Sequence, residues 1–174
     1  MHMMPLLAAA LLTLSGCDSQ TQQFLAADQD DVALSQETVL APGRWVTDAA
    51  GIIDEAAEVR MTQKLQGLER ATGHQMVVVT VPTLEGETID QYTLRLANSW
   101  SVGRREHNDG IVLLVAPNER QARIEVGLGL EDVVTNGFAS SVLETDMIPR
   151  LRQGNYSGGI TAGLDNLIGR LSDR

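Results

Sequence analysis

The stretch that decides the fold is Asn108–Asp132, NDGIVLLVAPNERQARIEVGLGLED. Its apolar run, Ile111–Ala116, is rich in β-branched residues and predicts a strand buried on both faces. After a short turn, Gln121–Val126 alternates apolar and charged side chains, which predicts a strand with one face in water. We expect the two strands to form a hairpin. The start of one strand then lies beside the end of the other, so Asp109 should meet the glycine-containing loop 127–132.

The composition indicates one domain of ordinary size with an additional N-terminal segment. The chain has 174 residues and a formal net charge of −10, from 23 acidic and 13 basic residues. A surface this acidic repels nucleic acid and anionic lipid, so nucleic-acid binding is not expected. The single cysteine excludes an internal disulfide and a cysteine-rich zinc site.

Residues 1–16 are expected to be a lipoprotein signal peptide. The apolar stretch Leu6–Leu14 carries no charge and is shorter than the ~20 residues that cross a bilayer. Small residues precede Cys17, and this sequence resembles the bacterial lipobox, whose cysteine is lipidated. The alternative is a free or buried cysteine in an ordinary N-terminal helix. Lipidation would anchor the protein to a membrane of the bacterial cell envelope, facing the periplasm, and Asp18 resembles an inner-membrane retention signal.

Residues 17–43 are polar and acidic without a periodic apolar pattern, which predicts a lipidated cysteine followed by a flexible tether. The domain proper is expected over residues 44–174. Within it, apolar spacing predicts a helix from about Glu55 to Thr72, capped by Asp54, and then a buried strand over 74–81.

The remaining elements are predicted from caps and breaks. Thr88 and Gln91 have the spacing of a capping box and should start a second helix. Thr135 should cap a third helix, and Pro149 should force a break or a restart before Leu151. A turn over 153–159 should precede the last amphipathic helix. A helix between parallel strands crosses over right-handed, so the element order predicts a three-layer α/β/α sandwich around a small mixed β-sheet.

Several short motifs together resemble the TPM domain family, over about residues 44–172. Each motif is weak by itself, and their joint occurrence in the family's order is specific. They are VTD at 46–48, ATGHQ at 71–75, WSVG at 100–103, NDG at 108–110, VGLGLE at 126–131 and GNYSGG at 154–159.

The resemblance implies a Rossmann-like α/β/α domain that is usually extracytoplasmic and membrane-associated. It also implies Ca²⁺ or Mg²⁺ binding or acid phosphatase activity, as attributed to some members, or a role in the assembly or repair of membrane proteins.

The glycine-containing loop invites a dinucleotide-binding interpretation. That motif requires a third glycine at position 132, which is Asp132 here, so nucleotide binding is not expected. The plainer interpretation is that Gly127 and Gly129 allow a tight loop with positive φ. Glycine backbone would also leave carbonyl groups open to a cation, with Asn108 and Gly110 supporting the same loop.

Four carboxylates at junctions between loops and strands are candidate metal ligands, and we expect them at one edge of the sheet: Asp48, Asp109, Glu131 and Asp132. Oxygen ligands without thiolates favour Ca²⁺ or Mg²⁺ over zinc. The alternative is helix capping by the first two and plain solvation of the others. Asp109 is also the first choice for a catalytic group, and the nearby His107 could donate a proton to a leaving group.

Two functions follow. The first is a lipid-anchored envelope protein that serves as a divalent-cation-dependent binding, assembly or quality-control module for a membrane-protein partner. The second, the alternative, is a weak metal-dependent acid phosphatase at the membrane face. The sequence shows neither a GxSxG motif nor a P-loop.

Overall fold

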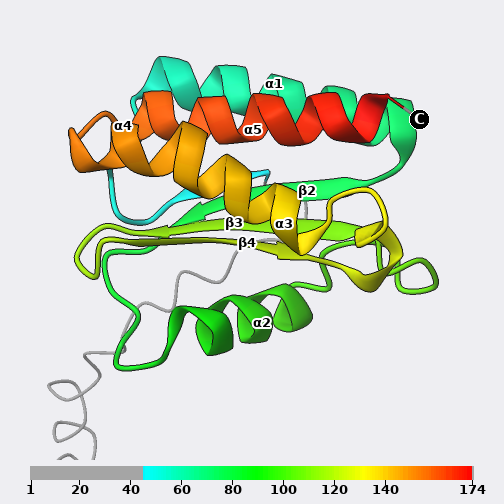
Figure 1. Cartoon of the computed structure of the whole chain (residues 1–174), viewed down its shortest axis with the longest axis horizontal. Coiled ribbons are helices and arrows are strands. Elements are labelled where there is room, and N and C mark those ends of the chain that lie inside the picture. Colours follow the sequence, from blue (N-terminus) through cyan, green and yellow to red (C-terminus); the bar gives the residue numbers. More distant parts are fainter. Residues whose placement is uncertain (1–44, 174) are drawn as a thin grey trace, which may run out of the picture. The chain divides into compact units, whose positions relative to one another are not determined.

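The computed structural model describes residues 45–173; the predicted signal peptide, Cys17 and the predicted tether lie outside this range. A four-stranded mixed sheet lies between two helical layers (Figure 1), as predicted. Helices α1, α3, α4 and α5 cover one face of the sheet, and α2 covers the other. The strands are β1 (Val46–Asp48), β2 (Gln75–Thr80), β3 (Gly110–Ala116) and β4 (Gln121–Val126). The helices are α1 (Glu55–Thr72), α2 (Ile89–Ser99), η1 (Leu128–Leu130), α3 (Asn136–Ser141), η2 (Val142–Met147), α4 (Ile148–Arg152) and α5 (Tyr156–Ser172).

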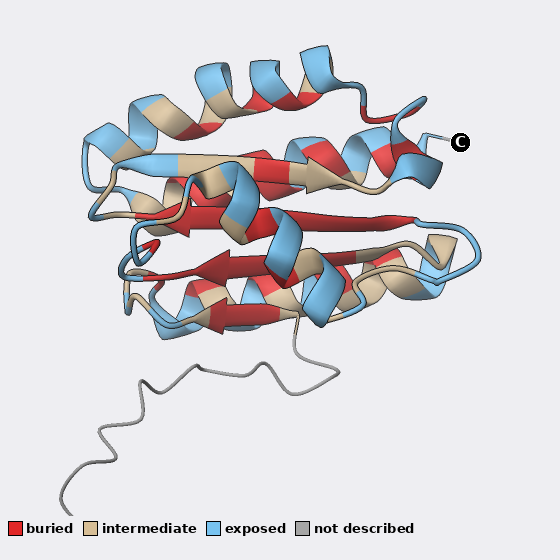
Figure 2. Cartoon of the chain, turned by 90° about the horizontal axis from the view of Figure 1, so that it is seen from below, coloured by how far each residue is buried: buried red, intermediate tan, exposed pale blue. Residues whose placement is uncertain are grey.

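The predicted hairpin is confirmed. Strand β3 pairs antiparallel with β4, with Ile111 opposite Val126, and parallel with β2 on its other side. Every residue of β3 is buried, whereas most of β4 is only partly covered (Figure 2). The sequence did not reveal β1, which is only 3 residues long and pairs parallel with β2.

The alternation of side chains along β3 divides the core into two parts. Ile111 and Leu113 face the layer of α1 and α5, and Val112 and Leu114 face α2. Helices α1 and α5 are also joined by polar groups, because the backbone N–H of Asp54 donates to Ser157 Oγ at 3.0 Å.

The helix starts follow the predicted caps. Asp54 accepts from the N–H of Ala57, Thr88 and Gln91 form the reciprocal capping box, and Thr135 caps α3. Each of these caps joins a side chain to a backbone group three residues away, so the local sequence suffices to predict it.

The C-terminal helices follow the predictions in part. A new α-helix, α4, starts at Ile148 with Pro149 in its first turn, as the restart alternative predicts, although the π-helical segment η2 joins it directly to α3. A proline there removes an N–H that has no helical partner in any case. The predicted turn 153–159 is shorter than expected, since Asn155 caps α5 and the helix already starts at Tyr156.

The two crossovers of the sheet have opposite hands. The strand order is β1-β2-β3-β4, so the chain moves across the sheet in one direction. Helix α1 makes its crossover on one face and α2 on the other (Figure 1). One crossover therefore departs from the right-handed rule. Within residues 45–173, no helix is both long and apolar enough to cross a membrane.

Candidate functional site

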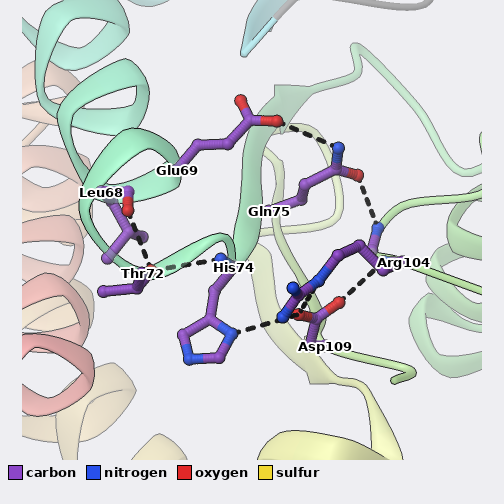
Figure 3. A network of polar contacts seen from close by, with 8 residues as sticks. Leu68, Glu69, Thr72, His74, Gln75, Arg104 and Asp109 are labelled. Atoms are coloured by element: carbon purple, nitrogen blue, oxygen red, sulfur yellow. Dashed lines mark hydrogen bonds and ion pairs between the residues drawn. The ribbon is translucent and has the colours of Figure 1, made fainter. Parts of the chain in front are cut away.

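The carboxylate of Asp109 is buried at the start of β3 and is fully engaged (Figure 3). Its Oδ1 accepts the backbone N–H of Arg104 at 2.7 Å, and its Oδ2 accepts from Nε of Arg104 at 2.8 Å and from Nη2. His74 Nδ1 lies 3.2 Å from the same Oδ2. We call these three residues the Asp109 cluster. A cation already faces this carboxylate, and it is the guanidinium of Arg104.

The environment of Asp109 favours its charged form. Burial raises the pKa of this carboxyl, but the hydrogen bonds from Arg104 and His74 outweigh that effect and lower the pKa to about 2. The group is therefore an ion at every pH near neutrality. As a charged, hydrogen-bonded acceptor it holds the loop 101–109 against the end of α1 and the start of β2.

A second set of hydrogen bonds continues from the cluster toward β1. Gln75 accepts the N–H of Gly103 at 2.9 Å and donates to Glu69 at 3.1 Å. Glu69 also accepts from the indole of Trp45 at 2.9 Å. The loop before β3 is thus fixed by side chains of α1 and β2.

Glycines allow backbone segments to approach closely around this loop. A Cβ at Gly127 would lie 2.1 Å from the backbone oxygen of Asn108, and one at Gly110 would lie 2.2 Å from that of Val102. Gly129 donates its N–H to the oxygen of Asn108 at 3.0 Å. The expectation of positive φ at Gly127 and Gly129 is wrong, because neither adopts it. These glycines are required by close approach of the backbone.

A hollow lies on the α2 side of this edge, and we call it the α2 hollow. It has a volume of about 360 Å³. Carboxylates of Glu125 and Glu131 line it, as do Asn108 and Gly127 from the predicted loop. Its apolar lining comes from α2, the strands and the η1 loop: Leu94, Ala97, Val102, Val112, Val126 and Leu128. Leu128 is 73% exposed and Leu94 is 52% exposed, so two large apolar side chains of the lining are open to solvent.

The four predicted metal ligands do not come together. Asp48 ends β1 and lies level with Val115, while Asp109 precedes β3, so about six residues of strand, roughly 20 Å, separate them. The oxygens of Asp48 accept the N–H groups of Ile52 at 3.1 Å and Ile53 at 2.8 Å and the hydroxyl of Thr80. Within residues 45–173, no three His, Cys, Asp or Glu side chains form a group that could hold a metal.

Asp48 therefore binds the loop before α1 and does not cap that helix, whose N-cap is Asp54. Glu131 and Asp132 are exposed, and Glu131 lines the α2 hollow. Of the two histidines within residues 45–173, His74 rather than His107 contacts Asp109. His107 is exposed, and its backbone oxygen lies beside Gly129.

Arg104 was not predicted from the sequence as a partner of Asp109. Its spacing of five residues before Asp109 could have suggested a local ion pair, but loop residues have no periodicity that would predict one. One feature of the sequence could have indicated this contact, namely Gly103 in the WSVG motif. Its φ of 95° allows the turn that brings Arg104 to the carboxylate.

Comparison with known proteins identifies the family. The sequence profile of the TPM domain matches residues 46–170. This chain belongs to the TPM domain family. The N-terminal domain of a protein from P. gingivalis, solved by NMR, is 32% identical with a TM-score of 0.71, covering 76% of this chain and 84% of that one. The comparison with curated proteins gave no significant match.

Two further solved structures share the fold at lower identity. The N-terminal domain of a protein from Corynebacterium glutamicum is 16% identical, with a TM-score of 0.59 over 76% of this chain and 83% of that one. The BA42 protein from Bizionia argentinensis is 20% identical, with a TM-score of 0.55 over 70% of this chain and 82% of that one. The TPM fold thus persists where most side chains differ.

Proposed function

We propose that this TPM domain protein is a lipid-anchored binding module of the bacterial envelope, and that its α2 hollow holds a segment of a membrane-protein partner. The observation that carries the proposal is that the exposed Leu94, Leu128 and Glu131 surround one hollow. Glu125 also lines the hollow, with its carboxylate bonded to Arg123. Apolar contact area beside carboxylates suits an amphipathic segment that carries basic side chains.

The rigidity of this edge supports binding rather than chemistry. The Asp109 cluster fixes the loop before β3, and Gly127 N–H donates to Gly110 O at 2.8 Å, so the loop after β4 is fixed to the same strand. A preformed surface loses little conformational entropy when a partner binds. The −10 net charge adds long-range attraction for a basic partner.

Any dependence on Ca²⁺ or Mg²⁺ would rest on Glu131 and Asp132. Asp109 is already bonded to Arg104 and His74, and Asp48 lies at the opposite edge of the sheet. Two exposed carboxylates supply fewer ligands than Ca²⁺ prefers, so the partner would have to complete the coordination. We therefore propose that a cation strengthens the complex and binds the free protein only weakly.

Site-specific crosslinking in living cells tests this function. A photo-reactive residue at position 128 of the full chain should crosslink to a membrane protein, and Glu131→Lys should weaken the crosslink. Position 59 is the matched control, because Val59 is also an exposed apolar residue, at 52%, on helix α1 in the other layer. Equal crosslinking from both positions, or none from 128, would contradict the proposal. Repeating the crosslinking in the presence of a chelator tests whether a divalent cation strengthens the complex, in which case the crosslink should weaken.

The alternative of a weak metal-dependent acid phosphatase depends on Asp109 as a ligand or nucleophile. Asp109 would have to release Arg104 before it could serve either role. If the activity exists, turnover of a chromogenic phosphomonoester should require added Mg²⁺ or Ca²⁺ and should vanish in Asp109→Asn that is still folded. Turnover that survives chelation or this substitution would exclude the mechanism.

A further inference from the structure

A larger cleft lies at the other end of the sheet, between the β3–β4 turn and the start of α5. Its volume is about 670 Å³, within the range of small-molecule sites. Figure 1 shows α4 and the β3–β4 turn at the same end of the molecule. An apolar floor comes from the sheet and from α4: Val115, Ala116, Ala122, Ile148 and Leu151.

Every charged side chain that lines this cleft is basic. Arg120 and Arg152 contribute guanidinium groups, and Gln121 and Tyr156 add further donors. No acidic residue of the described range 45–173 lines the cleft, although the chain as a whole is strongly acidic. Among residues 45–173, most basic side chains bind an acidic partner or a backbone oxygen, whereas Arg120 and Arg152 make no hydrogen bond or ion pair.

Arg120 lies at a position where the backbone is strained. Arg120 adopts a φ of 56°, a left-handed conformation that favours glycine or asparagine. An arginine at this turn position is therefore unfavourable for the backbone, while its side chain supplies a positive charge to the cleft. Strained positions of this kind are concentrated at functional sites.

We propose that this cleft binds a small amphiphilic anion, an apolar body that carries a carboxylate or a phosphate group. The planar guanidinium groups of Arg120 and Arg152 match either oxyanion with paired hydrogen bonds, and Tyr156 can add another. The floor of Ile148 and Leu151 takes the apolar part. This site is separate from the α2 hollow and does not depend on the function proposed for it.

Titration of the full chain by NMR tests the site, with Cys17→Ser so that no acyl chain competes for the floor. The probes are phenylacetate, phenyl phosphate and the neutral phenylacetamide. At least one anion should bind saturably and shift the amide resonances of residues 120–122 and 152–156. Phenylacetamide should bind at least about tenfold more weakly than that anion. Whichever anion binds more tightly shows whether the cleft prefers a carboxylate or a phosphate group. Absence of saturable binding by both anions would overturn the proposal.

Variants separate the cleft from general charge attraction. Arg120→Asn suits the left-handed backbone and should fold at least as well, yet bind the anion roughly tenfold more weakly. Arg152→Gln should show a similar loss. The control is Arg105→Gln, which removes an exposed arginine from the loop before β3, at the opposite edge, and should leave binding unchanged. A similar loss in all three variants would show attraction by charge alone and would overturn the site.

Discussion

The backbone oxygen of His107 occupies the space in which a side chain at Gly129 would begin, because a Cβ there would lie 1.9 Å from it. Gly129 is itself exposed, so burial does not explain the constraint. The backbones of the loops on either side of the β3–β4 hairpin are in contact, with the N–H of Gly129 bonded to the oxygen of Asn108, and both loops line the α2 hollow.

The first prediction follows from this contact. Gly129→Ala should lower the free energy of unfolding by about 1–3 kcal/mol, because the loops must separate to admit a methyl group. Gly137→Ala is the control, since a Cβ at Gly137 meets nothing within 4 Å in helix α3, and it should stabilise the protein slightly. Urea unfolding measures both. Equal effects from the two substitutions would contradict the close approach.

The second prediction concerns Asp109 and pH. Its folded-state pKa of about 2 lies below the ordinary 3.8, so its ionised form stabilises the fold above pH 4 and this contribution is lost as the pH falls toward 2. The shift corresponds to stabilisation on the order of 2 kcal/mol. Asp109→Asn should therefore lower stability at pH 7 and differ less from wild type at pH 2.5.

Unfolding curves at several pH values between 2 and 7 check this prediction. Asp132→Asn serves as the control, since it removes an exposed carboxylate near the same edge and should change stability by less than about 0.5 kcal/mol. A constant difference between Asp109→Asn and wild type at all pH values would mean that the charge of Asp109 is not what stabilises the loop.

The third prediction separates Asp48 from the candidate site. Asp48→Ala leaves the N–H groups of Ile52 and Ile53 without their acceptor, which should cost about 1–3 kcal/mol of stability. Crosslinking from position 128 should be unaffected in protein that remains folded, because Asp48 lies at the opposite edge of the sheet. Loss of the crosslink in a folded Asp48→Ala protein would restore this residue to the site.

The fourth prediction concerns membrane attachment. Cys17→Ser should abolish incorporation of labelled fatty acid and move the protein out of the membrane fraction, because an acidic domain has no electrostatic attraction for anionic lipid. Metabolic labelling followed by fractionation measures both effects. Wild-type protein that is unlabelled and soluble would contradict the lipoprotein prediction.

The sequence predicted the elements whose signals are local. The hairpin, the Asp54 and Thr88 caps and the buried run Ile111–Ala116 each depend on residues a few positions apart. Composition and periodicity also sufficed for the three layers, because a fully buried strand requires helices on both faces.

The candidate site was predicted only in part, because its composition depends on pairing between distant strands. The loop 127–132 and Asp109 meet through the local hairpin, as expected. Asp48 was assigned to the wrong edge because β1 is too short to show a period and its parallel pairing with β2 was not visible. The contact between His74 and Asp109 spans 35 residues, and the two short motifs that contain these residues do not indicate that they meet.

The bond between Asp54 and Ser157 has a consequence for the order of folding. It joins positions 103 residues apart, whereas Arg104 and Asp109 are 5 apart. Closing the longer loop costs about 2–3 kcal/mol more in chain entropy. We expect the hairpin and the Asp109 loop to form early and α5 to dock last. Until α5 leaves the ribosome, the apolar face of α1 that carries Met61 and Leu65 stays uncovered and is available to a chaperone.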